Sequence, residues 1–444
     1  MQRASVAASL LLLALLLVYG SAIGHGFIQD DFRWIETSRE AASGGPAGLL
    51  RHEVGFYRPL VAATFALNHA AFGMAPLGYA LTNAALFLAS ACLLFLVARR
   101  LGLSAGCALL SAGLWAFNFH AVNMALLWLS GRTALLVCAT GLATALCMLE
   151  RRHLLAGVCC LMALLSKEEA VLLPFMFAAW LAWGASGRRR GLAARLAPAW
   201  PLFAALAIYA VLRAQTGAFG PATAPPYYRL TIAPAVVLRN ILEYLDRGAT
   251  VAAVASLLLI GAARSLPSFD ERERRVFVFA MLWFVAGYGV TVFVPVRSSL
   301  YALVPSIGAC LAAGAVGSAL LRATPRPTRL AFAAMAVLPL LLVPVYRARN
   351  ARWIQTGALS AHALHEIRLA AALAPETRSI VLVDNRGERV TLDAAFGSLL
   401  PEALRLTLGP GYHGEIVADD AAARSRGGIV LRLIDGRLEP YSTR

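Results

Sequence analysis

Residues 77–100 have the sequence LGYALTNAALFLASACLLFLVARR, an apolar run that ends in Arg99 and Arg100. The part 77–98 contains no charged residue, and about 20 such residues span the hydrocarbon core of a bilayer as a helix. Water is absent there, so the backbone must form its hydrogen bonds within the segment, as a helix does. The stretch therefore predicts a membrane-spanning helix with one basic end.

The rest of the 444-residue chain repeats this pattern. Hydrophobic residues make up 59% of it and charged residues only 14%, against about 25% charged in soluble domains. Further apolar blocks lie at about 4–23, 103–119, 133–149, 154–166, 170–185, 198–213, 249–263, 276–294, 300–320 and 330–346. The sequence thus predicts an all-α polytopic membrane protein with about eleven transmembrane helices. The first block could instead be a signal peptide, but its length favours an uncleaved helix.

Arginines mark alternate connections between these blocks. One set of connections holds basic clusters, which indicates the cytoplasmic face: Arg99 and Arg100; Arg151 and Arg152; Arg188, Arg189, Arg190 and Arg195; Arg264, Arg272, Arg274 and Arg275; Arg322, Arg326 and Arg329. Arg3 places the N-terminus on the same side. We therefore expect a multi-pass protein of the inner (cytoplasmic) membrane with a cytoplasmic N-terminus and an extracytoplasmic C-terminal segment.

The distribution of charges and cysteines argues against a nucleic-acid-binding protein and against a disulfide-linked or cysteine-metal protein. The net charge of +16 could suggest nucleic acid, but the basic residues flank apolar blocks, as topology signals and anionic-lipid contacts do. All seven cysteines lie inside apolar blocks without a CxxC pair or a Cys/His cluster, so neither disulfides nor a cysteine metal site is expected.

We divide the chain into a membrane domain, 1–346, and a tail, 347–444. The membrane domain includes a long first outer loop, 24–76. The tail contains β-rich runs at Ser379–Val383 and Gly428–Ile434 and a helical stretch near Leu392–Leu406, with turns marked by glycine and proline. It is predicted to be a small extracytoplasmic α+β domain.

Two adjacent acids, Asp30 and Asp31, follow the first apolar block on the outer side. A carboxylate here could take a proton from an attacking hydroxyl as a general base, or bind a divalent cation. The alternative is a solvated pair or a helix N-cap.

Other polar residues gather at the outer ends of the blocks. They include four cations that could line one anionic pocket facing the two acids, because guanidinium groups match phosphate oxygens well: Arg58, Arg132, Lys167 and Arg297. The segment 60–73 suits an interfacial helix. The alternatives are a membrane-interface anchor for Arg58 and a structural ion pair for Lys167 with its glutamates.

Six of these stretches, in this order, resemble the GT-C class of membrane glycosyltransferases, and within it the transmembrane O-mannosyltransferases that carry tetratricopeptide repeats, with their bacterial relatives. They are Asp30-Asp31, Tyr57–Leu60, Gly78–Asn83, Trp128–Arg132, Leu165–Ala170, and Arg297–Tyr301 with Pro305–Gly308. The chain departs from the family pattern at Ala80, where a histidine is common, at Val296, where an acid is common, and in lacking the repeats.

The resemblance implies a polyprenyl-phosphate-linked sugar as donor, transfer to an acceptor hydroxyl on the outer face, and Asp30 or Asp31 as catalytic base. We take as candidates for binding the substrate or the lipid phosphate Arg58, Arg132, Lys167, Glu168, Arg297 and Tyr301, and as other pocket candidates His52, Tyr57, Asn83, His120 and Asn123. Whether the reaction needs a divalent cation, Mg²⁺ or Mn²⁺, is left open. If it does, Asp30 or Asp31 is the expected ligand. The acceptor could be a glycan, a lipid or a protein.

Two other functions stay open at this point. A transporter or flippase of a lipid-linked saccharide would also use charges at membrane depth, although no matched halves with broken helices are visible. A non-catalytic membrane scaffold would use the tail to bind a partner.

Overall fold

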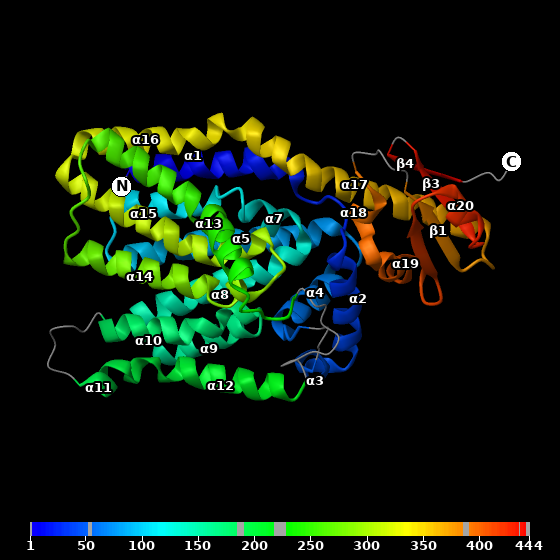
Figure 1. Ribbon diagram of the computed structural model, residues 1–444, viewed down its shortest axis with the longest axis horizontal. Coiled ribbons are helices and arrows are strands. Elements are labelled where there is room, and N and C mark those ends of the chain that lie inside the picture. The colour runs from blue at the N-terminus through cyan, green and yellow to red at the C-terminus, as the bar shows by residue number, and fades with distance from the viewer. Residues whose placement is uncertain are drawn as a thin grey trace.

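A computed structural model describes residues 2–51, 56–183, 191–216, 228–384, 390–434 and 436–440, and it leaves out the side chains of 2–5 and 7. Every predicted apolar block corresponds to a helix: α1 (Gln2–Tyr19), α5 (Pro76–Leu101), α6 (Ala105–Ala116), α8 (Arg132–Leu149), α9 (His153–Leu164), α10 (Leu173–Trp183), α12 (Trp200–Ala214), α13 (Pro234–Ala263), α14 (Glu271–Tyr288), α15 (Leu303–Ala323) and α16 (Pro325–Leu341). These helices lie roughly parallel in one bundle (Figure 1).

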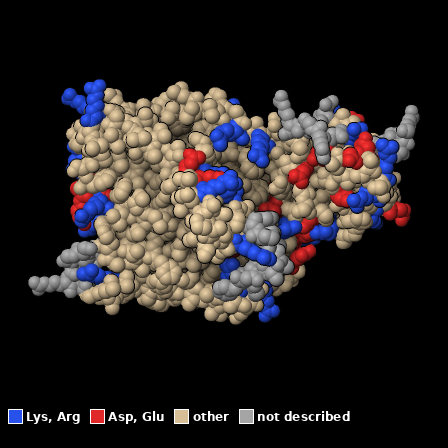
Figure 2. All heavy atoms as spheres, viewed as in Figure 1, with Lys and Arg blue, Asp and Glu red and all other residues tan. Residues whose placement is uncertain are grey.

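The expected count of about eleven spans is not confirmed. Among the described residues, six helices are long and apolar enough to cross a membrane, or seven if the bent pair Pro325–Leu341 and Val343–Leu373 counts as one span. Helices such as α6 and α9 have 12 residues, which at about 1.5 Å per residue is shorter than a hydrocarbon core. Figure 2 shows that uncharged side chains cover most of the bundle on one face, with charges gathered at its ends and over α13.

Two segments that we expected to be loops are helical. The helix α13 begins at Pro234 rather than near 249, because its first turns carry i,i+4 pairs between Arg239, Glu243 and Arg247 that stabilise a charged helix. In the first outer loop, α2 (Asp30–Ser43) and α3 (Gly45–Leu50) precede α4 (Pro59–Phe72), which corresponds to the helix expected at 60–73. The two acids thus occupy the first turn of α2, where the helix dipole favours negative charge.

The helix α17 (Val343–Leu373) leads into the tail without a break at residue 346. The tail sheet has strand order β2-β1-β3-β4. In it, β1 (Ser379–Val383) runs parallel to β2 (His413–Val417) and β3 (Ile429–Ile434), and β4 (Arg437–Pro440) is antiparallel to β3. The remaining tail helices are α18 (Leu392–Phe396), α19 (Leu400–Leu408) and α20 (Asp420–Arg424). The predicted β runs and helical stretch are confirmed.

The tail shares a hydrophobic core with the first outer loop. Phe32 and Ile35 of α2 belong to the same buried cluster as Ile380 and Phe396 of the tail. The opposite sheet face, with Val381, packs on α20 instead, as the alternation of strand side chains requires. Figure 1 shows the tail at the end of the bundle where α2 and α4 lie, away from the N-terminus.

Candidate active site

Asp31 is fully buried and bonded on both carboxylate oxygens. Its Oδ1 accepts hydrogen bonds from the backbone N–H and the hydroxyl of Ser130 at 2.8 and 2.5 Å, and its Oδ2 accepts from the N–H of Ile28 at 2.9 Å. Burial raises the pKa of Asp31 to about 7, although the donors on Ser130 and Ile28 oppose the shift. With three protein donors in place, this carboxylate joins α2 to the turn before α8.

Asp30 has a different environment. Its residue is exposed and lies at the start of α2. Desolvation by the surrounding protein raises the pKa of its carboxyl, whereas the cations Arg33 and Arg58 lower it. Of the two acids, Asp30 is therefore the one at an exposed residue, and the charges of Arg33 and Arg58 act on its carboxyl.

Arg58, just before α4, forms the first of two neighbouring ion pairs. Its Nε and Nη2 donate to Oε2 of Glu168 at 3.1 and 2.9 Å, and its guanidinium lies 4.2 Å from the ring centroid of Phe56. Arg213 approaches the other oxygen of Glu168 at 3.8 Å and donates to the hydroxyl of Tyr209 at 2.6 Å. Arg58 and Arg213 lower the pKa of Glu168, although burial opposes them. The carboxylate of Glu168 thus holds two arginines together.

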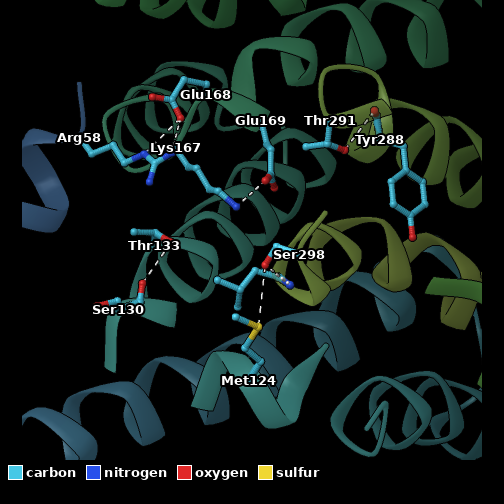
Figure 3. A network of polar contacts seen from close by, with 11 residues as sticks. Arg58, Met124, Ser130, Thr133, Lys167, Glu168, Glu169, Tyr288, Thr291 and Ser298 are labelled. Carbon is cyan, nitrogen blue, oxygen red and sulfur yellow. Dashed lines mark hydrogen bonds and ion pairs between the residues drawn. The ribbon is translucent and has the colours of Figure 1, made fainter. Parts of the chain in front are cut away.

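Lys167 forms the second pair, with Glu169 (Figure 3). Both side chains are buried, and the Lys167 ammonium lies 4.7 Å from the ring centroid of Tyr301, which attracts it through a cation–π interaction. Glu169 also contributes to raising the pKa of Arg58, so the two pairs lie close together. The two pairs together contain three cations and two carboxylates, which leaves one positive charge in excess: Arg58, Arg213 and Lys167 with Glu168 and Glu169.

Two of the expected phosphate-binding or pocket residues, Arg132 and Asn83, hydrogen-bond to each other in the protein interior. Arg132 is fully buried. Its Nε donates to Oδ1 of Asn83 at 2.8 Å, its Nη2 donates to the carbonyl of Tyr79 at 3.0 Å, and its guanidinium lies 4.3 Å from the ring centroid of Phe65. Asn83 in turn donates to the carbonyl of Leu129 at 3.1 Å. Arg132 and Asn83 therefore brace the turn that holds Asp31.

Arg297 lies in a separate charged group. It pairs with Glu243, which also contacts Arg239 and Arg247 at 3.2 Å each. Of the four cations that we expected to line one pocket, Arg58 and Lys167 pair with the adjacent acids Glu168 and Glu169. Arg132 and Arg297 have partners elsewhere.

The remaining pocket candidates are dispersed. Asn123 is hydrogen-bonded to Asn350 and accepts from Trp353 at 2.8 Å, which fastens α7 (Val122–Leu127) to α17. The ring centroid of His120 lies 4.3 Å from that of Phe119, with the two rings tilted by 40°. Tyr57 is buried, with its ring centroid 6.0 Å from that of Tyr209. His52 lies outside the described residues.

Sequence reasoning left three residues of this region out of the candidate site: Ser130, Glu169 and Arg213. Arg213 carried a signal, since it is a lone arginine at the end of an apolar block on the side that we predicted to be extracytoplasmic, where the positive-inside rule disfavours it. Ser130 and Glu169 lay within quoted motifs, but only the fold shows that they bind Asp31 and Lys167.

A divalent cation does not fit the two acids as they stand. Asp31 has its oxygens occupied by three hydrogen-bond donors, and Arg33 and Arg58 lie near Asp30. Within the described ranges, no group of three or more histidine, cysteine or acidic residues is placed to hold a metal. We therefore derive no catalytic step through a metal.

Comparison with known proteins gives matches of sequence and of fold. No protein-family model matches the chain. An alignment over 175 residues is 34% identical to the protein O-mannosyl-transferase Tmtc1 of Drosophila melanogaster, and it covers 35% of this chain and 20% of that relative. The chain thus spans a fifth of that relative.

The fold matches that of ArnT from Cupriavidus metallidurans. For the apo structure the TM-score is 0.51 at 17% identity, over 92% of this chain and 77% of ArnT. For the structure with undecaprenyl phosphate bound, the TM-score is 0.46 at 17% identity, over 90% of this chain and 76% of ArnT. The expected resemblance to GT-C membrane glycosyltransferases is confirmed by the match to Tmtc1 and the shared fold.

Proposed function

We propose that this chain, which resembles the GT-C membrane glycosyltransferases, transfers a sugar from a polyprenyl-phosphate donor to an acceptor hydroxyl on the outer face of the membrane. The proposal is supported by Asp30, an exposed acid at the start of α2 within electrostatic reach of Arg58, and by the neighbouring ion pairs of Arg58 and Lys167. A base for the acceptor and cations for a phosphate leaving group are the two requirements of this reaction.

Asp30 acts as the general base in this proposal. The acceptor oxygen forms a bond to the anomeric carbon of the sugar, the bond from that carbon to the phosphate oxygen breaks, and Asp30 takes the acceptor proton. General-base assistance of this kind contributes about 10²–10⁴-fold in rate. In-line attack inverts the anomeric carbon. Asp31 keeps its hydrogen bonds and holds the turn in place.

Arg58 and Lys167 bind the phosphate of the donor and stabilise the charge that it gains on leaving. Nε and Nη2 of Arg58 donate to Glu168, which leaves the Nη1 donors of Arg58 for the phosphate. The planar guanidinium matches the geometry of phosphate oxygens. Glu168 and Glu169 keep the cations oriented before the donor arrives, which reduces the reorganisation needed in the transition state.

The experiment is transfer from polyprenyl-phosphate sugars, mannosyl and other hexosyl donors among them, in membranes that contain the wild type, Asp30→Asn or Asp31→Asn. We expect transfer by the wild type and its loss in Asp30→Asn, with donor binding retained. Normal transfer in Asp30→Asn would overturn the assignment of the base. Donor binding by the wild type without turnover would favour transport or a scaffold.

We also propose the orientation in the membrane. The basic ends of α5 and α15, with Arg99, Arg100 and Arg322, would face the cytoplasm together with the N-terminus. The tail and α2 would then lie outside, at the opposite end of the bundle (Figure 1). This arrangement puts Asp30 on the extracytoplasmic side.

A further inference from the structure

The tail binds α2 through a buried carboxylate. Arg405 of α19 donates its Nε and Nη2 to the two oxygens of Glu36 at 2.6 and 2.8 Å. The Glu36 side chain is only 8% exposed. A two-point arginine–carboxylate pair fixes orientation as well as distance, so it sets the angle of α2 against the tail.

Two further contacts lie on either side of Asp30. Directly before it, the N–H of Gln29 donates to the carbonyl of Ala395 at 2.8 Å, and the side chain of Gln29 donates to the carbonyl of Ala394 at 3.1 Å. Three residues after it, Arg33 pairs with Glu402 at 3.2 Å. Gln29 has a φ of +47°, a conformation that L residues rarely adopt, and its bond to Ala395 helps hold it there.

The approach to this turn is also confined by α17. A Cβ on Gly26 would lie 2.2 Å from the carbonyl oxygen of Gly357, so the two backbones touch. Phe32 stacks on Phe396 with ring centroids 5.7 Å apart. The segment from Gly26 to Glu36 therefore meets α17 or the tail through backbone, aromatic and ionic contacts.

We infer that the tail positions the general base, with Arg405, Glu36 and Gln29 as positioning residues for Asp30. This inference rests on the proposed function. Asp31 ties the turn to the membrane bundle through Ser130, and Gln29 ties it to the tail. Asp30 lies between these two attachments, so its distance from Arg58 depends on how the tail is docked. A misplacement of about 1 Å at a reacting group costs roughly 10²-fold in rate.

The test uses the full-length protein with Glu36→Gln, Arg405→Gln, and the exchanged pair Glu36→Arg with Arg405→Glu. For each single variant we expect kcat to fall about 10-fold or more, with the donor KM unchanged, and faster hydrogen–deuterium exchange in residues 28–40. The exchanged pair should recover part of the lost kcat and part of the slow hydrogen–deuterium exchange. Arg426→Gln is the matched control, since its pair with Glu415 at 3.3 Å is exposed and lies within the tail.

Exchange in β1 reports whether the tail itself stays folded, and it should not change in any variant. Unchanged exchange in residues 28–40 with unchanged kcat would overturn the inference, and so would faster exchange with unchanged kcat. If the wild type transfers no sugar from any donor, the proposed function fails. The exchange rates then still decide whether the tail holds the Asp30 turn.

Discussion

The carboxylate of Asp31 accepts hydrogen bonds from both the backbone amide and the hydroxyl of Ser130, at 2.8 and 2.5 Å. The pair joins the first turn of α2 to the 3-10 turn Leu129–Gly131 that precedes α8. With the N–H of Ile28 as a third donor, Asp31 is buried and hydrogen-bonded, whereas Asp30 lies at an exposed residue. We therefore propose Asp30 for the chemistry, while Asp31 holds the turn before α8.

Asp31→Asn is expected to destabilise the protein, whereas Asp30→Asn is not. An amide at position 31 places an NH₂ group against a backbone donor, and such a buried mismatch costs about 1–3 kcal/mol. Thermal unfolding of the two purified variants in detergent measures the difference. Equal midpoints would show that the Ser130 bonds contribute nothing to stability.

The acidic limb of the pH–rate profile is expected to move to higher pH in Arg33→Gln. The base works as a carboxylate, so the rate rises as Asp30 loses its proton. Arg33 lowers the pKa of Asp30 against the effect of burial, and removing this cation raises that pKa. Arg39→Gln, an exposed arginine on the same helix, is the control and should leave the limb in place. If the acidic limb lies at the same pH in both variants, the titration of Asp30 does not determine it.

Arg58→Lys is expected to raise the donor KM and to lower kcat/KM about 10- to 100-fold. Lysine keeps the charge but loses the fork, and a hydrogen bond to a charged group is worth about 1.5–3 kcal/mol. Steady-state kinetics with varied donor measure the change. Arg326→Lys, at the exposed basic end of the bundle, should behave like the wild type. An unchanged donor KM in Arg58→Lys would show that Arg58 does not bind the donor phosphate.

Gly131→Ala is expected to destabilise the turn that holds Asp31. A Cβ at this position would lie 2.6 Å from the carbonyl oxygen and 2.7 Å from the Cα of Ala125, so the backbone must shift. Overpacking of this kind costs about 1–3 kcal/mol. Gly261→Ala is the control, because a Cβ there meets nothing within 4 Å and alanine favours a helix. Similar unfolding temperatures for both variants would contradict the close packing.

Thiol labelling tests the orientation in the membrane. Cysteines introduced at Ser43 and Ser379 are expected to react with an impermeant reagent from outside intact cells or spheroplasts, and one at Gly191 is not. Ser43 and Gly191 are both exposed in the fold, so a difference between them reports sidedness rather than burial. Labelling at Gly191 alone would invert the proposed topology.

The sequence predicted the helices of the bundle well, because each apolar block must form a helix in a bilayer. It failed for α2 and for the first half of α13, where charges interrupt the apolar pattern. In α13 those charges belong to Arg239, Glu243 and Arg247, which pair along one helix face. Such pairs stabilise a helix without producing an apolar stripe.

The candidate site was predictable only in part. Motif resemblance pointed to Asp30, Arg58 and Lys167. Arg58 acts electrostatically on Asp30, and Arg58 and Lys167 pair with the adjacent acids Glu168 and Glu169. Arg132 looked equally accessible, but the groups that bury it come from other helices, among them Asn83 and Phe65. Spacing along one chain cannot show which cation is covered by residues so far away in sequence.

A structure with polyprenyl phosphate bound is the most direct measurement of the central claim, which is that Asp30 and the Arg58–Lys167 group face each other across the donor phosphate. We expect the phosphate oxygens within hydrogen-bond distance of Arg58 and Lys167, with the Asp30 carboxylate on the side where an acceptor would enter. A phosphate bound at Arg297 and Arg247 instead, away from Asp30, would contradict the account.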